Sequence, residues 1–319
     1  MTEKKIITVF GATGRQGGGL ARAILAEHGD AAEFAVRAVT RHPDSEPAQE
    51  LKRLGAEIVR ADMDDEASLP AAFEHAYGAF CMTNFWEHLS AEREGVQAEA
   101  MARAAAHAGV QHAIWSTLDD TRECVPLDDP RMPTLQGRYK VPHFDGKAEA
   151  DHHFTDAGVP TTFLRTTFFW ENLLGAFAPE HSADGALWLT YPMGDSRLSG
   201  MASDDVGKTA LSVFRLGGSA VAATISIAGE HLKVADMAAA LTEAVDRPVR
   251  YRPLTADEWR AQGAPGADET GNMFQYYAEC EQRFTDARDL DAVRRLNPAL
   301  QDFSTWLAAH HEALRNAWT

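Results

Sequence analysis

IITVFGATGRQGGG, at residues 6–19, is the stretch of this chain that decides its fold. A run of apolar and β-branched residues ends at Phe10, glycines follow at positions 11, 14 and 17, and a helical apolar pattern begins at Leu20. This order predicts a strand, a tight turn and a helix. The spacing GxxGxxG by itself would also fit a glycine-rich turn before any helix. Its place between a strand and a helix favours a dinucleotide-binding turn.

Each glycine has its own physical role in such a turn. Gly11 permits the sharp turn off the strand, Gly14 lets backbone N–H groups approach a pyrophosphate, and Gly17 lets the helix pack against the sheet. The helix N-terminus then presents N–H groups and the positive end of its dipole to the phosphates.

Composition and charge narrow the class of protein. The chain has 319 residues, of which 45% are hydrophobic and 24% charged, and this fits one large α/β domain or two smaller ones. Its net charge of -17 argues against a broad surface for nucleic acid. No apolar run approaches the about twenty residues of a membrane span, and residues 1–19 lack the pattern of a signal peptide. We therefore expect a cytoplasmic protein that contacts no membrane.

The cysteines predict no covalent framework. Cys81, Cys124 and Cys280 are widely separated and form no CxxC pair. An odd, sparse count is typical of reduced thiols in the cytosol, so we expect neither a disulfide framework nor a metal site.

Strands and helices alternate in the first half of the chain. Strands are expected at 6–10, 34–39, 57–59, 78–82, 112–115 and 161–165, with helices near 17–28, 44–54, 65–76, 90–108 and 143–157. This order predicts an α/β protein with a doubly wound parallel sheet of the Rossmann type and a ligand crevice at the carboxyl ends of the strands. Residues 118–142 have no clear period and are expected to form an irregular excursion over that crevice.

The alternation loosens from about residue 166. Helices are expected at 204–216, 233–245 and 303–317, with a strand at 223–227. We therefore expect a nucleotide-binding Rossmann domain at 1–165 and a smaller C-terminal α+β lobe at 166–319, whose elements can return to the main sheet.

The end of the second strand indicates which nucleotide is bound. NAD-specific domains carry an acidic residue there for the ribose 2′-hydroxyl, but this strand ends in Thr40-Arg41-His42. Arg41 can offer a bidentate contact to a 2′-phosphate, and Arg15 in the glycine turn points to the same region. NADP(H) is therefore expected in preference to NAD. The alternative is that both arginines are ordinary exposed charges.

Two further strand ends offer candidate contacts. After the third strand, Asp62 is placed for the adenine amino group and Met63 for the ring, while Asp64 and Asp65 are expected to cap the next helix. The segment Thr83-Asn84-Phe85-Trp86-Glu87 after the fourth strand falls at the level of the nicotinamide ribose. A turn-forming asparagine and a packed tryptophan would also explain that segment.

At this point the sequence resembles a family. GATGRQGG at 11–18, Arg41, MTNFWE at 82–87, PHFDGKAEAD at 142–151 and FFWENLL at 168–174 are similar to the NmrA-like proteins, an atypical branch of the short-chain dehydrogenase/reductase superfamily. Within that branch the likeness is greatest to the HSCARG-type NADP(H) sensors, and it extends to 272–274 and 296–298.

The resemblance implies a Rossmann domain with strand order 3-2-1-4-5-6 and a small C-terminal lobe. It also implies roles for individual residues around NADP(H). The pyrophosphate would be held by Gly11, Thr13, Gly14, Arg15, Gln16 and Gly17, the 2′-phosphate by Arg41, and the nicotinamide end by Thr83, Asn84, Lys147 and the 168–172 stretch that includes Phe168, Phe169 and Asn172.

The candidate catalytic residues depart from the superfamily pattern. Better-known members use Ser, Tyr and Lys, with Tyr and Lys four residues apart on one helical face, so that Tyr exchanges a proton with the substrate. Here Lys147 occupies the lysine position and Ser116 the serine position, but His143 stands where Tyr is expected. Tyr139 lies eight residues before Lys147, outside the expected helix.

Two functions fit this pattern. In the first, His143 and Lys147 are structural or hold the cofactor, and the protein is a redox sensor or regulator that reports the NADPH/NADP⁺ ratio through its shape or a protein partner. In the second, Lys147 or His143 is the acid of an NADPH-dependent reductase, and Phe85, Trp86 and Trp170 line a pocket for a small aromatic, quinone or carbonyl/imine substrate. His143 as a cap or packing residue is a third interpretation.

The missing tyrosine favours the sensor over the reductase. A DNA-binding repressor is disfavoured by the acidic charge. The sequence leaves the oligomeric state open, a homodimer included.

Overall fold

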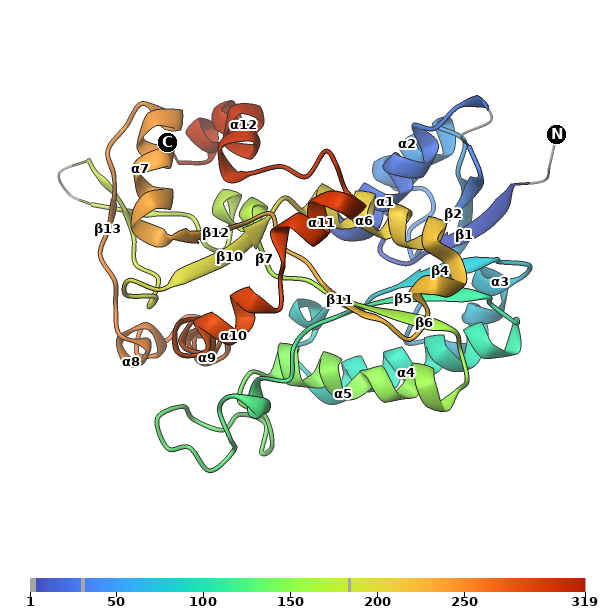
Figure 1. The fold of residues 1–319 in the computed structure, drawn as a ribbon, viewed down its shortest axis with the longest axis horizontal. Helices are drawn as coiled ribbons and strands as arrows, with labels where there is room; N and C mark the ends of the chain where they lie inside the picture. The colour runs from blue at the N-terminus through green and yellow to red at the C-terminus, as the bar shows by residue number, and fades with distance from the viewer. Residues whose placement is uncertain (1–3, 30–31, 183–184, 319) are drawn as a thin grey trace. The chain divides into compact units, whose positions relative to one another are not determined.

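The computed structural model describes residues 4–29, 32–182 and 185–318 (Figure 1). These residues form two compact units. The first comprises residues 1–119, 146–166 and 203–225, and the second comprises 120–145, 167–202 and 226–319. The chain thus leaves the first unit and returns to it, and each unit is assembled from segments that are far apart in the sequence.

A seven-stranded sheet forms the centre of the first unit. Its strands stand in the order β11-β6-β5-β4-β1-β2-β3. They are β1 (Lys5–Val9), β2 (Phe34–Thr40), β3 (Glu57–Arg60), β4 (Gly78–Cys81), β5 (His112–Thr117), β6 (Thr161–Arg165) and β11 (Thr224–Ser226). The predicted order 3-2-1-4-5-6 is confirmed, and β11 adds a seventh strand beside β6.

The central strands are apolar because both of their faces are covered. Val9, Phe80 and Ile114 in β1, β4 and β5 have no solvent exposure. Strands β1 to β6 pair in parallel, with Val9 opposite Ala38 of β2 on one side and Phe80 of β4 on the other. Their carboxyl ends therefore meet at one edge of the sheet.

Helices cover the two faces of this sheet (Figure 1). They are α1 (Arg15–Leu25), α2 (Glu46–Arg53), α3 (Leu69–Phe73), α4 (Ala91–His107), α5 (Pro142–Asp156) and α6 (Ser203–Leu216). α1 packs against α6 on one face. On the other face Phe73, Met101 and Phe154 of α3, α4 and α5 join one buried apolar cluster. The helix expected at 65–76 is instead a short 3-10 turn at Glu66–Ser68 followed by α3, which has a proline in its first turn.

The second unit contains two small sheets and a set of helices. One sheet has the order β12-β10-β7 and the other β13-β9-β8. The strands are β7 (Phe168–Phe169), β8 (Glu180–His181), β9 (Leu187–Leu189), β10 (Arg197–Met201), β12 (Glu230–Lys233) and β13 (Val249–Tyr251). The helices are α7 (Val234–Val245), α8 (Ala256–Arg260), α9 (Ala267–Glu279), α10 (Glu281–Asp286), α11 (Leu290–Leu296) and α12 (Phe303–Ala317).

Aromatic side chains form the core of the second unit. The rings of Tyr191 and Phe274 stack with centroids 5.0 Å apart, and Phe177 meets Phe274 edge to face at 5.4 Å. A second cluster joins Trp170 to Phe303 and Trp306 of α12. Offset and edge-to-face pairs of this kind add to the stabilisation that burial provides. The α+β lobe expected from the sequence is therefore confirmed as an α+β unit with its own core.

One face of α9 holds the irregular segment 120–145 in an antiparallel direction. The α9 residues involved follow one another at three- or four-residue steps, as contacts along one helical face require. In the first turns of α9, Glu269 accepts from the backbone N–H of His143 (2.8 Å), and Asn272 donates to the carbonyls of Lys140 (2.5 Å) and Pro133 (2.9 Å). Further along the helix, Gln275 donates to the carbonyl of Arg131 (3.1 Å), and Glu279 pairs with the guanidinium of the same arginine (3.1 Å).

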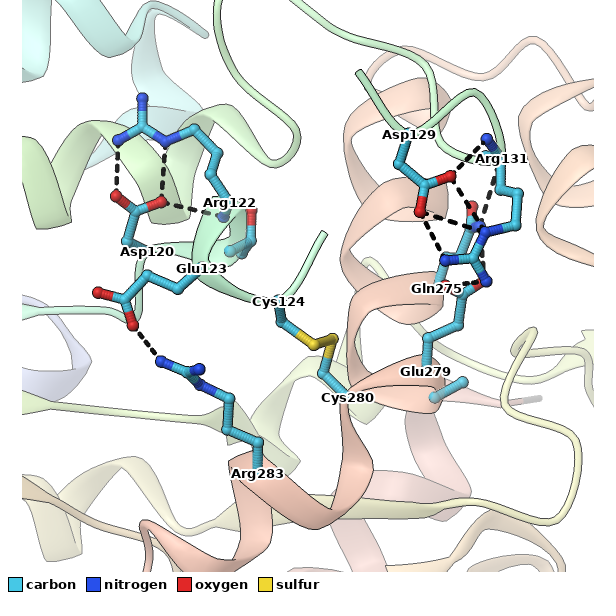
Figure 2. The surroundings of a disulfide bond; sticks show 12 residues. Asp120, Arg122, Glu123, Cys124, Asp129, Arg131, Gln275, Glu279, Cys280 and Arg283 are labelled. Carbon is cyan, nitrogen blue, oxygen red and sulfur yellow. Dashed lines mark hydrogen bonds and ion pairs between the residues drawn. A yellow bond between two sulfur atoms is a disulfide. The ribbon is translucent and has the colours of Figure 1, made fainter. Parts of the chain in front are cut away.

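A disulfide between Cys124 and Cys280 ends this series of contacts (Figure 2). Next to it, Glu123 forms an ion pair with Arg283 of α10. The expectation that all three cysteines are reduced thiols is therefore wrong for Cys124 and Cys280, while Cys81 is a buried free thiol. The two bonded cysteines are 156 residues apart, and their pairing depends on how segment 120–145 lies along α9, which no local spacing reveals.

No helix among the described residues has both the length and the apolar character needed to cross a lipid bilayer.

The disulfide predicts a reductant-sensitive stability. We expect the variant Cys124→Ser/Cys280→Ser, or the reduced protein, to lose about 2–4 kcal/mol of the free energy of unfolding, because the cross-link no longer restricts the unfolded chain. Thermal unfolding with and without a thiol reductant measures this loss, and the double variant should not respond to reductant. Thiol titration after denaturation should find one reactive cysteine before reduction and three after it. Three reactive thiols in the unreduced protein would contradict the bond.

Candidate functional site

The glycine turn lies at the carboxyl end of β1 and has the predicted form. Gly11 has a φ of +66°, and the Gly14 N–H donates to the Gly11 carbonyl at 2.9 Å before α1 begins at Arg15. A Cβ at Gly17 would lie 2.4 Å from the Phe10 carbonyl oxygen, so only glycine lets α1 approach the strand. Gly14, at the N-cap position of α1, has no side chain with which to bond the first N–H groups of the helix, and these can thus serve an anion.

Gln16 and Ser116 lie together beside this turn. The Ser116 hydroxyl donates to Gln16 Oε1 at 2.7 Å, and Ser116 is almost fully buried at the end of β5. Thr13 and Arg15 are exposed in the same turn. The serine that sequence comparison places at a catalytic position therefore uses its proton to hold a residue of the glycine turn.

Arg41 lies directly after β2 and pairs with a carboxylate. Its Nη1 is 2.9 Å from Glu87 Oε2 and its Nη2 is 3.0 Å from Glu87 Oε1. Glu87 ends the 3-10 turn η3 (Phe85–Glu87) after β4 and also accepts from Asn84 Nδ2 at 3.2 Å. β2 and β4 are the two neighbours of β1, so the pair joins the segments on either side of the strand that carries the glycine turn.

The residues that follow β3 make packing contacts, hydrogen bonds and an ion pair within the first unit. Met63 is partly buried against the apolar cluster, and Asp62 accepts from the backbone N–H of Asp64 at 3.1 Å. Asp64 pairs with Arg93 of α4, and this bond lowers the pKa of the Asp64 carboxyl to about 2. Asp64 therefore does not cap the next helix as expected, and Asp65 stands at the N-cap position of the 3-10 turn η2 (Glu66–Ser68) without a side-chain cap bond.

After β4, Thr83 is buried, whereas the aromatic residues that follow differ in exposure. Phe85 is buried and its ring meets Trp86 edge to face at 5.4 Å, while Trp86 is half exposed. Of the residues expected to line a substrate pocket, Trp86 is thus the one that presents a large aromatic surface to solvent in the first unit.

Lys147 is enclosed by three acceptors. Its Nζ donates to the Thr83 carbonyl at 3.0 Å and to Thr83 Oγ1 at 2.6 Å, and it lies 3.0 Å from Glu94 Oε1. Thr83 Oγ1 in turn donates to Glu94 Oε1 at 2.7 Å. An ammonium group has three N–H donors, and here each of them has an acceptor.

Glu94 is the least exposed member of this group. It has no solvent exposure, and its Oε2 has no hydrogen-bond partner among the residues that the structure describes. Removing one partner of such a buried pair strongly destabilises the folded protein, because the other charge stays buried without compensation. The pair therefore fixes the position of the Lys147 side chain.

Trp115 of β5 packs beside the group formed by Lys147, Thr83 and Glu94. Lys147 Nζ lies 5.3 Å from the centre of the Trp115 ring, a cation–π distance. Asp151, one turn further along α5, accepts from Trp115 Nε1 at 3.0 Å and from Thr117 Oγ1 at 2.6 Å. Burial raises the pKa of the Asp151 carboxyl to about 6.

Each residue of HFDGK, at 143–147, has a defined contact. Within the second unit His143 Nδ1 bonds to Glu269 Oε1, Phe144 packs against Tyr276 and Tyr277, and Asp145 accepts from the backbone N–H groups of Thr121, Lys140 and Val141. Burial raises the pKa of the Asp145 carboxyl. Within the first unit Gly146 allows α5 to approach α4, since a Cβ there would lie 2.8 Å from Ala91 Cβ, and Lys147 then reaches Thr83.

The expected nicotinamide residues Phe168, Phe169 and Asn172 and the expected pocket residue Trp170 belong to the second unit. Phe168 is 3% exposed and packs against Phe177 and Phe274, and Trp170 is 1% exposed in the Trp306 cluster. Asn172 lies in the 3-10 turn η5 (Trp170–Leu174). Phe168 and Trp170 thus contribute to the core of that unit.

Sequence reasoning placed Glu87 at the level of the nicotinamide ribose but missed its pairing with Arg41, and it missed the acidic partners Glu94 and Glu269 altogether. Glu87 and Glu269 pair with residues distant in the chain and carry no local signal. Glu94 had one, because the buried face of α4 recurs at Ala91, Glu94, Ala98, Met101 and Ala105, a helical period that includes this glutamate. Tyr139, as expected, lies before the start of α5.

Comparison with known proteins places the chain in a family. The model of the NmrA-like family matches residues 3–307. The chain belongs to the NmrA-like family. Its curated relatives include the NmrA-like family domain-containing oxidoreductases FrzB of a Cladobotryum species, 28% identical over 85% of this chain and 83% of the relative, and malD of Malbranchea aurantiaca, 30% identical over 78% and 76%.

Solved structures of other proteins share the fold. NmrA, a negative transcriptional regulator, in complex with NAD aligns with a TM-score of 0.79 at 22% identity, covering 99% of this chain and 98% of NmrA. The triphenylmethane reductase of Citrobacter sp. complexed with NADP(H) aligns with a TM-score of 0.71 at 18% identity, covering 99% and 100%. At these identities the likeness establishes the architecture.

The close approach of α5 and α4 predicts the effect of adding one methyl group. We expect Gly146→Ala to lower the free energy of unfolding by roughly 1–3 kcal/mol, because the new Cβ overlaps Ala91 and must push the helices apart. Gly95→Ala is the matched control on α4, where the nearest atom would be 3.9 Å away and the same change should be neutral or stabilising. Urea unfolding of both variants makes the comparison, and equal effects would contradict this explanation of Gly146.

The buried Asp151 carboxyl predicts a pH dependence of stability. Because its pKa in the folded protein is about 6, above the ordinary aspartate value of 3.8, the folded state binds this proton more tightly than the unfolded state. The resulting stabilisation is present below about pH 4 and is lost as the pH rises through about 6, by up to about 3 kcal/mol. Asp151→Asn should lack this decline. Unfolding midpoints measured from pH 4 to 7 test it, and parallel curves for the two proteins would refute it.

Proposed function

We propose that this chain binds NADP(H) at the carboxyl ends of β1, β2, β3 and β4 and acts as an NADP(H)-responsive regulator. The glycine turn and the uncapped N-terminus of α1 suit a pyrophosphate. Arg41 is the cation at the end of β2, where NAD-specific domains have a carboxylate. The family relation supports the cofactor class, since NmrA has been crystallised with NAD and with NADP.

The single observation that carries the regulatory role is the occupation of the candidate proton donors. Lys147 Nζ donates to the carbonyl and hydroxyl oxygens of Thr83 and forms an ion pair with Glu94, and the Ser116 hydroxyl donates to Gln16. His143, the other candidate acid, has its Nδ1 bonded to Glu269. Proton transfer to a substrate requires a donor within hydrogen-bond reach of the reacting atom. Groups that are already bonded within the protein suit the holding of a cofactor better than proton exchange.

A reductase is the second candidate, favoured by the curated relatives, which are named oxidoreductases. In that case bound NADPH would supply a hydride to a small aromatic, quinone or carbonyl/imine compound. Lys147 would supply the proton after release from one of its acceptors. Trp86, half exposed after β4, would provide an aromatic surface for a flat substrate.

Binding and turnover separate these functions. We expect NADPH to bind, Arg41→Ala to weaken NADPH binding about tenfold by removing a charge-assisted contact to the 2′-phosphate, and NADH binding to stay unchanged in that variant. Titration calorimetry measures the affinities. Equal weakening of both dinucleotides would contradict the role of Arg41.

The turnover arm uses a panel of quinones, aldehydes and imines. The regulator predicts NADPH oxidation no faster than in buffer. Rapid oxidation that Lys147→Ala abolishes, while the exposed surface variant Glu46→Gln leaves it intact, would establish the reductase instead. A failure to bind either dinucleotide would refute both candidates.

A further inference from the structure

The ion pair between Arg41 and Glu87 covers the group on which NADP recognition depends. Both terminal nitrogens of the guanidinium are paired, at 2.9 and 3.0 Å, with the two oxygens of one carboxylate. The pair is accessible, because the two side chains are 45% and 42% exposed. Asn84 donates a further hydrogen bond to Glu87, which holds the carboxylate on the Arg41 side of η3.

We propose that Glu87 is a specificity-determining residue that reduces the preference of this site for NADP over NAD. The inference rests on the proposed cofactor site. A 2′-phosphate that binds the two terminal nitrogens of Arg41 has to displace the Glu87 carboxylate from the same N–H groups. If the carboxylate stays nearby after displacement, the two anions repel each other.

The same carboxylate favours the dinucleotide that lacks the phosphate. In NAD-specific domains an acidic residue at the end of the second strand accepts a hydrogen bond from the ribose 2′-hydroxyl. Here β2 ends in Arg41, and the carboxylate beside that position comes from η3, after β4. Glu87 thus lowers the affinity for NADP and supplies an acceptor for NAD, and both effects reduce the ratio of the two affinities.

The expected size of the effect follows from the exposure of the pair. Exposed ion pairs contribute little, so displacing Glu87 lowers NADP affinity by at most about fivefold. Loss of one hydrogen-bond acceptor for the 2′-hydroxyl weakens NAD binding by a similar factor. Removing the whole Glu87 carboxylate, as in Glu87→Ala, should therefore raise the ratio of NADP to NAD affinity by about five- to twentyfold, and removing only its charge should raise the ratio by at most about fivefold.

The test compares Glu87→Gln and Glu87→Ala with the unaltered protein and with a matched control, Glu46→Gln. Glu46 also pairs with an exposed arginine, Arg53, but at the two ends of α2. Calorimetric titration with NADP⁺, NAD⁺ and adenosine 2′,5′-bisphosphate gives the affinities. We expect both Glu87 variants to bind adenosine 2′,5′-bisphosphate and NADP⁺ more tightly. Glu87→Ala should also bind NAD⁺ more weakly, because it loses the acceptor that the amide oxygen of Glu87→Gln retains. Glu46→Gln should change nothing.

The outcomes separate this inference from the proposed function. If the unaltered protein binds NADP⁺ but the Glu87 variants leave the affinity ratio unchanged, Glu87 has no role in specificity and the cofactor site stands. If the ratio falls, Glu87 supports Arg41 rather than competing for it, and the proposal is overturned. If the unaltered protein binds no dinucleotide, the cofactor site and the inference fall together. Unchanged circular dichroism and melting temperature show that the variants are folded.

Discussion

The close approach of α5 to α4 at Gly146 and Ala91 is the constraint on which the candidate site of the first unit depends. Only because no Cβ intervenes can the next residue, Lys147, reach the end of β4 and the first turn of α4. There its charge meets Glu94, a carboxylate without solvent exposure, and Thr83 joins the two through its hydroxyl. Burial of an ion pair is costly unless its donors and acceptors are well matched, and here a single threonine serves as acceptor for the lysine and donor for the glutamate. In the sequence DGK, the glycine thus permits the close packing of the two helices, and the lysine that follows it supplies the charge.

The features predicted from the sequence were those with a local cause. The glycine turn could be predicted because the steric limits on Gly11 and Gly17 arise from atoms within a few residues or at the end of the adjacent strand. The strand order was predicted from a family resemblance that rests on such local motifs. The partners of the site residues could not be found in this way. Glu87 and Arg41 are 46 residues apart, and Glu269 and His143 are 126 apart. Such contacts arise from the order of strands and the direction of helices, so single-sequence patterns do not contain them. The same holds for Cys124 and Cys280, where composition suggested a reduced protein. Glu94 is an exception among these partners, because its position in the apolar period of α4 is a local signal in the sequence. That signal conflicts with the usual place of glutamate at the protein surface.

A common principle connects the cations of the first unit. This is a strongly acidic chain, yet the proposed ligand is itself an anion. Arg41 and Lys147 each lie beside a carboxylate, one exposed and one buried. At the proposed cofactor site, a 2′-phosphate would take the place of Glu87 as the anionic partner of Arg41, whereas the ribose hydroxyls expected near Lys147 are neutral. The exposed pair can exchange at low cost, and the buried pair resists exchange. This difference offers a physical reason why recognition of the adenosine end and use of the nicotinamide end could respond differently to substitution.

The Cys124–Cys280 bond has a consequence for the connectivity of the molecule. The covalent loop that it closes contains β6, α6 and β11, which belong to the first unit, although both cysteines belong to the second. A single backbone cut anywhere inside the loop therefore leaves one covalently joined molecule, and its two fragments separate in a denaturing gel only after reduction. Because each unit consists of three separate segments, neither corresponds to a continuous piece of the gene, and shortening the chain from one end cannot yield either unit intact.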